Sequence, residues 1–241
     1  MRRKSMRCFV LLTLWLVLLG CEKEQVLVSE PFPPINIEMD PPSANSWLAL
    51  GDSYTIGQGV EPSHRFPAQA VELLAQKNIK IDTLTYLATT GWTTVDLMAA
   101  IKSTQPTKHK VVSLLIGVND QYRSWDTAGY RVRFRDLLVK AIDLANGKND
   151  FVWVLSIPDY GVTPYARNMD TTRISREIDY YNHINWEVTE NFKCNYIDIT
   201  ELTRQGRKNK LLISGDSLHP SAIDYRRWAS LLVDELVLAL N

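Results

Sequence analysis

From Ser46 onward the sequence alternates short apolar segments with longer segments of helical periodicity. The clearest apolar segment, Val111–Ile116, is almost continuously hydrophobic, as expected of a parallel strand that is covered on both faces. Segments of the same kind predict five strands in all. They cover Trp47–Leu50, Ile79–Leu87, Val111–Ile116, Phe151–Ile157 and Tyr196–Ile199.

The intervening segments carry apolar residues at the spacing of an amphipathic helix. In the last one, which follows Pro220, Tyr225, Trp228 and Leu232 share one face. The other predicted helices cover Phe66–Lys77, Thr93–Ile101, Tyr130–Ala145 and Arg173–Phe192. Strands that alternate with helices form right-handed βαβ units, so we predict an α/β fold, a three-layer α/β/α sandwich with a five-stranded parallel sheet. In such sheets, sites form beyond the carboxyl ends of the strands.

The N-terminal segment does not share this pattern. Four basic residues among the first seven precede the apolar run Phe9–Leu19, which is shorter than the roughly 20 residues of a membrane-spanning helix. This order predicts a secretory signal. The segment ends in Leu18-Leu19-Gly20-Cys21, which resembles the lipobox of bacterial lipoproteins and implies cleavage before Cys21 and a lipid on its thiol. The alternative is an uncleaved buried or membrane helix with a chance cysteine.

The expected organisation is a lipoprotein signal peptide at residues 1–20, a lipid-anchored linker at 21–45 and a folded domain at 46–241. The linker contains five prolines and no sustained periodicity, which favours an extended, semi-rigid tether. The protein is therefore expected to be exported and anchored through Cys21 in the bacterial cell envelope, on the periplasmic or surface face.

Charge and cysteine content exclude several classes of protein. The chain has 27 Lys and Arg and 27 Asp and Glu; without the four basic residues of the signal, 23 remain against 27, a formal charge of −4. A mildly acidic protein lacks the electrostatic footprint of a nucleic-acid binder. Cys8 would leave with the signal and Cys21 would carry lipid, so Cys194 remains as a buried thiol with no cysteine for an intramolecular disulfide.

Four short motifs fall after predicted strands or just before the last helix, each an ordinary turn composition when taken alone. Because they follow one another in order at the mouth of one predicted sheet, they are expected to converge there. They are Gly51-Asp52-Ser53-Tyr54, Gly91, Gly117-Val118-Asn119-Asp120 and Asp216-Ser217-Leu218-His219-Pro220.

These motifs resemble the four blocks of the SGNH (GDSL) hydrolase family, and the resemblance covers nearly all of residues 46–241. It implies the flavodoxin-like fold of that family and an ester-hydrolase activity. The first, third and last blocks match closely. The second departs from the family pattern, because Thr89 stands where the family often has an asparagine two residues before the glycine.

The residue types suit acyl transfer, which needs a nucleophile, a base and donors for the developing oxyanion. Ser53 is the expected nucleophile, His219 its base, and Asp216 the group that orients the imidazole. The backbone N–H groups of Ser53 and Gly91 and the side-chain amide of Asn119 would form the oxyanion hole. Asp52 and Asp120, which neighbour two of these residues, are expected to be structural.

Other mechanisms have weaker support. The sequence has no Gly-x-Ser-x-Gly elbow, no paired histidine spacing typical of zinc and no complete phosphate-binding loop, so we expect neither a metal nor a cofactor. The segment Ser156–Pro164 should reach the same mouth, either as part of the substrate site or as a plain connecting loop.

We therefore predict a serine esterase that hydrolyses acyl or acetyl esters, with lysophospholipids, thioesters and acetylated glycans as candidate substrates. Its expected partners are the ester substrate and the membrane that holds the anchor. The alternative is a non-catalytic surface lipoprotein that binds glycan or lipid on a hydrolase scaffold. A chain that had lost activity would be expected to lack Ser53, Asn119 or His219, and all three are present.

Overall fold

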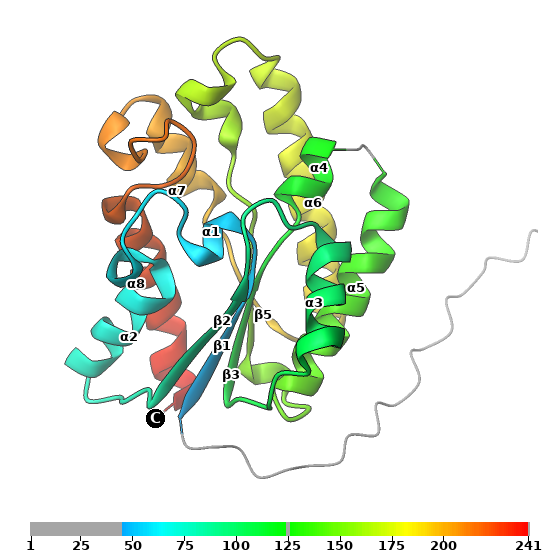
Figure 1. Cartoon of the computed structure of the whole chain (residues 1–241), viewed down its shortest axis with the longest axis vertical. Helices are drawn as coiled ribbons and strands as arrows, with labels where there is room; N and C mark the ends of the chain where they lie inside the picture. Colours follow the sequence, from blue (N-terminus) through cyan, green and yellow to red (C-terminus); the bar gives the residue numbers. More distant parts are fainter. Residues whose placement is uncertain (1–44, 124–125, 241) are drawn as a thin grey trace, which may run out of the picture. The chain divides into compact units, whose positions relative to one another are not determined.

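A five-stranded parallel sheet forms the centre of the computed structural model, which describes residues 45–123 and 126–240 (Figure 1). The strand order is β2-β1-β3-β4-β5, and every neighbouring pair is parallel. The strands are β1 (Ser46–Gly51), β2 (Thr83–Ala88), β3 (Val111–Leu115), β4 (Val152–Leu155) and β5 (Asn195–Ile197). The predicted α/β sandwich is confirmed.

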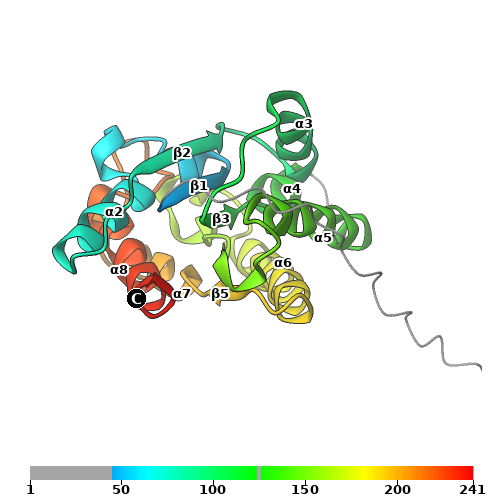
Figure 2. The same ribbon diagram turned by 90° about the horizontal axis from the view of Figure 1, so that it is seen from below.

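Two layers of helices cover the sheet, as Figures 1 and 2 show from the side and from below. One face is covered by α2 (Phe66–Gln76) and α8 (Ala222–Leu240). The other is covered by α3 (Thr94–Thr104), α5 (Thr127–Leu144) and α6 (Thr171–Asn191). Shorter helices occupy the connections: α1 (Ser53–Ile56), α4 (Val118–Arg123), α7 (Thr200–Arg204), and the 3₁₀ segments Pro62–His64, Asn149–Phe151, Tyr160–Val162, Pro164–Ala166, Gln205–Arg207 and Lys210–Leu212.

The interior strand β1 is buried along its whole length, which explains its apolar run Trp47–Leu50. Leu50 lies between partners on β2 and β3, and Trp47 donates from Nε1 to Ser113 Oγ over 3.0 Å. On the α2–α8 face, the ring centroids of Phe66 and Trp228 lie 6.1 Å apart, so the two helices share an aromatic contact. This packing fixes the helices against the sheet and holds the loops at its carboxyl end.

Several strand boundaries differ from the prediction, and the predicted strand Phe151–Ile157 is shortened to Val152–Leu155. The predicted strand Ile79–Leu87 begins only at Thr83, because Asn78 has a left-handed φ of 62° that turns the chain after α2. The predicted strand Tyr196–Ile199 ends at Ile197. There the Asp198 carboxylate accepts the backbone N–H of Thr200 over 2.9 Å and begins α7.

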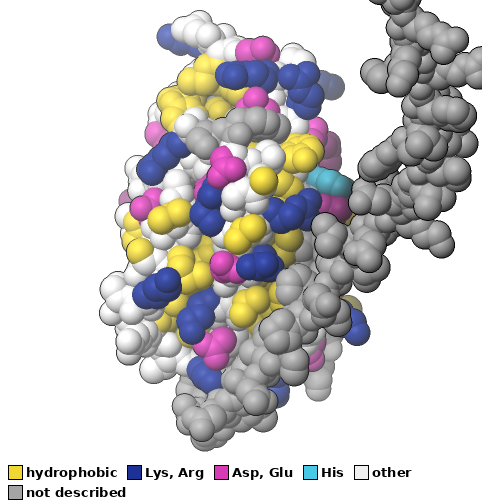
Figure 3. Space-filling model, turned by 90° about the vertical axis from the view of Figure 1, so that its right-hand side faces the viewer, with side chains coloured by type: hydrophobic (Ala, Val, Ile, Leu, Met, Phe, Trp, Pro, Cys, Tyr) yellow, Lys and Arg dark blue, Asp and Glu magenta, His cyan; other side chains and the backbone are white. Residues whose placement is uncertain are grey.

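The predicted signal at residues 1–20, Cys21 and the linker as far as residue 44 lie outside the described residues. No helix within the described ranges is long and apolar enough to cross a membrane. Cys194 is buried, and this burial raises the pKa of its thiol to about 12. The side of the molecule in Figure 3 carries basic and acidic side chains interspersed among apolar ones.

Candidate active site

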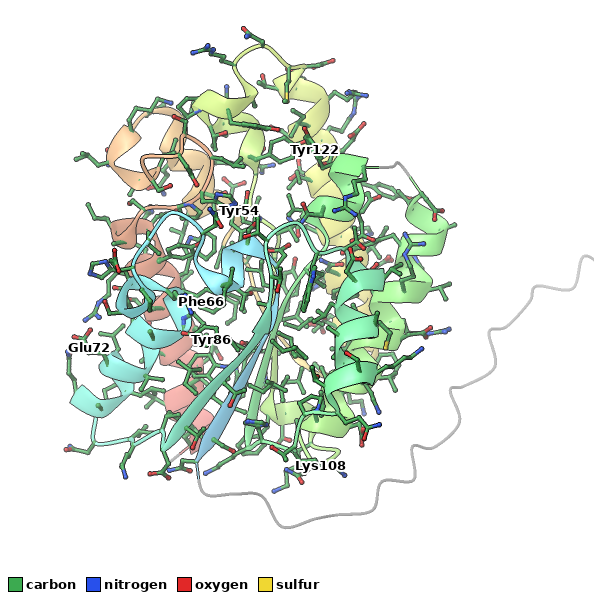
Figure 4. All side chains as sticks on the ribbon, viewed as in Figure 1. Tyr54, Phe66, Glu72, Tyr86, Lys108 and Tyr122 are labelled. Atoms are coloured by element: carbon green, nitrogen blue, oxygen red, sulfur yellow. The ribbon has the colours of Figure 1, made fainter. Side chains whose placement is uncertain are left out.

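The strand order places a crevice at the carboxyl end of β1. The chain passes from β1 to β2 on one side of β1 and then crosses to β3 on its other side. The connections that leave β1 and β3 therefore run in opposite directions, and the crevice lies between them. Ser53 follows β1, Gly91 follows β2 and Asn119 follows β3. Figure 4 shows Tyr54 and Tyr122 at this end of the sheet and Lys108 at the opposite end.

Ser53 is the first residue of α1 and is 5% exposed. The Asp52 side chain caps this short helix by accepting the backbone N–H of Tyr54 over 3.0 Å. Gly51 is required before it, because a Cβ there would lie 2.5 Å from the carbonyl oxygen of Leu115. The sharp turn from strand to helix thus depends on glycine and on the capping side chain of Asp52.

His219 and Asp216 are joined by a short hydrogen-bonded loop. His219 Nδ1 lies 2.7 Å from Asp216 Oδ2. Asp216 Oδ1 accepts the backbone N–H groups of Leu218 and His219, each over 2.9 Å, and the hydroxyl of Ser214 over 2.7 Å. Ser217 completes the turn with a left-handed φ of 68°. The carboxylate therefore holds both the loop and the imidazole ring.

The electrostatics of Asp216 suit that position. Partial burial by itself raises the pKa of the carboxyl, but the hydrogen bonds from Ser214, His219 and Leu218 outweigh it and lower the pKa to about 2. Asp216 is thus a carboxylate at neutral pH and can accept the Nδ1–H of the imidazole. The other side of the His219 ring faces Tyr54, with ring centroids 5.1 Å apart.

Asn119 and Gly91 are held at the other side of the crevice. Asn119 donates from Nδ2 to the Trp92 carbonyl over 2.9 Å and lies 3.5 Å from Asp52 Oδ2. Arg123 donates from Nη2 to the Gly91 carbonyl over 2.7 Å. In the described part of the chain, the backbone N–H groups of Ser53 and Gly91 donate to no other protein group.

Glycine at position 91 is explained by the backbone conformation of a turn. Among protein atoms, a Cβ there would meet only Arg123 Nη2, at 3.7 Å, so crowding by the protein does not require glycine. Instead, Gly91 is the third residue of a turn that the Trp92 N–H closes on the Thr89 carbonyl over 3.2 Å, and its φ is 84°. That φ matches a type II turn, which favours glycine or asparagine.

We therefore expect Gly91→Ala to lower the stability of the protein more than Gly91→Asn does. A left-handed φ costs alanine roughly 1–2 kcal/mol, whereas asparagine tolerates it better. Thermal unfolding should show a Tm lower by several degrees for the alanine variant and a smaller loss for asparagine. If the larger asparagine side chain proves worse, crowding rather than backbone strain explains the glycine.

The two aspartates expected to be structural are both buried. Desolvation raises the pKa of Asp52 to about 8, and the nearby Asp120 contributes to the rise. Asp120 accepts the backbone N–H of Thr94 over 2.8 Å and its hydroxyl over 2.6 Å. Asp120 thereby ties α4, which carries Asn119, to the start of α3.

One cavity of about 150 Å³ is bordered by four of the predicted site residues, Ser53, Gly91, Asn119 and His219. Its walls also include tyrosines that sequence reasoning missed. The lining residues are Ser53, Tyr54, Thr90, Gly91, Val118, Asn119, Tyr122, Tyr160, Tyr165, Leu218 and His219. Tyr160 brings the predicted loop Ser156–Pro164 to the cavity. Asp216 lies behind His219, and no hydrogen bond joins Ser53 to His219 within the described ranges.

Comparison with known proteins identifies the family. Residues 49–227 match the GDSL-like lipase/acylhydrolase family. The chain belongs to that family. Membership makes this GDSL-family protein an ester hydrolase, and it supports the enzyme over the non-catalytic binder. A search of curated proteins gave no match. Among the residues described, no group of three or more His, Cys, Asp and Glu could hold a metal ion.

Solved structures similar to this GDSL-family chain share its fold at low identity. An acetylxylan esterase from Geobacillus stearothermophilus is 21% identical with a TM-score of 0.61, covering 81% of this chain and 95% of its own. A lipase/acylhydrolase from Enterococcus faecalis is 21% identical with a TM-score of 0.62, covering 82% and 97%. The protein TesA is 19% identical with a TM-score of 0.62, covering 79% and 97%.

Proposed function

We propose that this GDSL-family hydrolase is a serine esterase in which Ser53, His219 and Asp216 form a catalytic triad. The observation that carries the proposal is the 2.7 Å Asp216–His219 pair, whose imidazole borders the same cavity as Ser53 and Asn119. A carboxylate on Nδ1 leaves Nε2 as the basic nitrogen. Apo geometry between a nucleophile and its base is often loose, so the missing Ser53–His219 bond agrees with this role.

In the proposed reaction, His219 Nε2 accepts the Ser53 hydroxyl proton while Ser53 Oγ attacks the ester carbonyl carbon. The oxyanion receives hydrogen bonds from the backbone N–H groups of Ser53 and Gly91 and from Asn119 Nδ2. Collapse breaks the bond to the alcohol oxygen, which takes the proton from His219. Water then attacks the acyl-enzyme, giving its proton to His219, and Ser53 leaves with that proton as the acid is released.

The cavity size favours a short acyl group. About 150 Å³ is available beside Ser53, below the roughly 300–1,000 Å³ of pockets that enclose drug-sized ligands. Tyr54, Val118 and Leu218 provide an apolar wall for a few carbon atoms. A long acyl chain would extend out of this space and leave much of its surface in water.

This leads to an expected result for a p-nitrophenyl ester series from acetyl to palmitoyl. We expect kcat/KM to be highest between acetyl and butyryl and to fall at least tenfold by octanoyl. Steady-state hydrolysis below the critical micelle concentration of each ester measures this. A maximum at octanoyl or longer would contradict the short-acyl assignment without bearing on Ser53.

We also propose that the protein is a lipoprotein, attached through Cys21 to the cell envelope. The support is the basic and apolar N-terminal sequence ending in Leu-Leu-Gly-Cys. A Cys21→Ser full-length protein should remain unprocessed and should incorporate no radioactive fatty acid. The wild-type protein should be cleaved and labelled. If the variant is cleaved and labelled like wild type, the lipoprotein assignment is wrong.

A further inference from the structure

A second cavity, of about 410 Å³, adjoins the one at Ser53. Tyr122 and Tyr160 border both, so their rings stand between the two spaces. Tyr122 lies on α4, as Asn119 does, and the second cavity extends from Tyr122 to α6. An ester held at Ser53 has two parts, and this second cavity adjoins the space where the acyl part would lie.

The second cavity differs in chemistry from the first. Its wall includes Gln121, Arg123, Asp170, Arg173 and Glu177, so its two cationic and two anionic side chains balance. Arg173 Nε and Glu177 Oε1 lie 3.9 Å apart, and the Arg173 side chain is 60% exposed. The hydrocarbon chain of a fatty alcohol would displace water from these charged side chains and offer them no hydrogen bonds. A fatty alcohol is therefore disfavoured in the second cavity.

Gln121 positions one of the carboxylates in the wall of the second cavity. The residue is 6% exposed and donates from Nε2 to Glu177 Oε2 over 2.7 Å. Its Oε1 is buried, and among the described residues it has no hydrogen-bond partner. Because protein atoms cover this oxygen, a ligand in the cavity does not reach it, and the part of the Gln121 amide is to hold Glu177 at the cavity wall.

Tyr122 adds an aromatic surface at the junction. The residue is 52% exposed, its hydroxyl lies 2.8 Å from that of Tyr165, and its ring centroid lies 5.9 Å from that of Tyr160. These contacts hold the ring at the opening between the cavities, on the α6 side of Tyr54 in Figure 4. A sugar-like ring could place its C–H groups on this face and its hydroxyls among the polar groups beyond.

We infer that the second cavity is the leaving-group subsite and that it selects a neutral, hydroxyl-rich alcohol. This rests on the proposed function, because it assumes ester cleavage at Ser53. Hydroxyls can donate to Glu177 and accept from Arg173. An anionic alcohol such as a glycerophosphate would meet Asp170 and Glu177 as well as the arginines, so the balanced charge disfavours it.

The test compares alcohols at a fixed acyl group. The probes are p-nitrophenyl acetate, a mono-acetylated methyl glucoside and acetylated glycerophosphate. Wild type should have a lower KM for the glucoside ester than for the glycerophosphate ester. Arg173→Ala should lose at least tenfold more kcat/KM on the glucoside ester than on p-nitrophenyl acetate, mainly through KM, because only the sugar engages the guanidinium.

Arg176→Ala is the matched control, since Arg176 is an exposed arginine on α6 that does not line the cavity. Arg176→Ala should leave kcat/KM unchanged for the glucoside ester and for p-nitrophenyl acetate. Equal losses on both substrates for Arg173→Ala, losses no larger than the control, or a preference for the anionic ester would overturn the subsite. Failure of the proposed function has a different signature, namely p-nitrophenyl acetate hydrolysis that survives in Ser53→Ala.

Discussion

Replacing Ser53 with alanine is expected to lower kcat/KM for p-nitrophenyl acetate by about 10⁴-fold or more, because it removes the hydroxyl that forms the acyl-enzyme in the proposed reaction. The substitution removes one oxygen atom and leaves the backbone N–H of the oxyanion hole in place. Asp52 caps α1 through the backbone of Tyr54, so the helix keeps its capping bond. The effect should therefore appear in kcat and not in the fold.

The control for this variant is Ser103→Ala, a serine in α3 whose hydroxyl donates to the Ala100 carbonyl within the same helix. Both variants should unfold within a few degrees of wild type and have the same circular dichroism. Ser103→Ala should retain full activity. Activity of a well-folded Ser53→Ala protein within threefold of wild type would rule out Ser53 as the nucleophile.

The second large effect is expected at the base. His219→Ala should cost about 10⁴–10⁶-fold in kcat/KM, and Asp216→Asn less, about 10²–10⁴-fold. Without Asp216 the imidazole is still present and can accept a proton, although it is poorly oriented. In Asp216→Asn, the amide oxygen can accept the hydrogen bonds from Ser214 and from the two backbone N–H groups. The amide nitrogen then faces His219 Nδ1. That contact favours the tautomer that is protonated at Nε2, which cannot act as the base.

Parallel measurement of kcat/KM and Tm for both variants checks the ranking. Asp216 also holds the loop through three further hydrogen bonds, so some loss of stability is expected in Asp216→Asn and must be separated from the loss of catalysis. Equal losses in kcat/KM for the two folded variants, or a larger loss for Asp216→Asn, would contradict the roles assigned to them.

The fold could be predicted from the sequence wherever burial leaves a clear pattern. Strands β1 and β3 lie inside the sheet with both faces covered, and their apolar runs mark them. The start of β2 was misplaced because Ile79 and Ile81 are apolar but lie in a loop. Ile79 is buried without belonging to a strand, a tertiary effect that local periodicity does not contain.

The sequence predicts candidate site residues that the fold brings near one another, but it predicts only part of their geometry. Asp216 and His219 are three positions apart, so a loop can join them, and it does so with a 2.7 Å hydrogen bond. Tyr122 and Tyr165 reach the cavity from α4 and from the segment before α6, which are distant in sequence. Each stands in an unremarkable local context, and only the packing of these elements brings the two hydroxyls together.

The most direct test of the proposed mechanism is covalent labelling with a fluorophosphonate, followed by peptide mass spectrometry. The serine oxygen displaces fluoride from phosphorus, and the stable adduct marks the activated nucleophile. We predict a single adduct on Ser53 whose growth parallels the loss of esterase activity, and no adduct on the folded Ser53→Ala protein. Inactivation with the adduct on another residue, or full activity after complete labelling of Ser53, would contradict the assignment of Ser53 as the nucleophile.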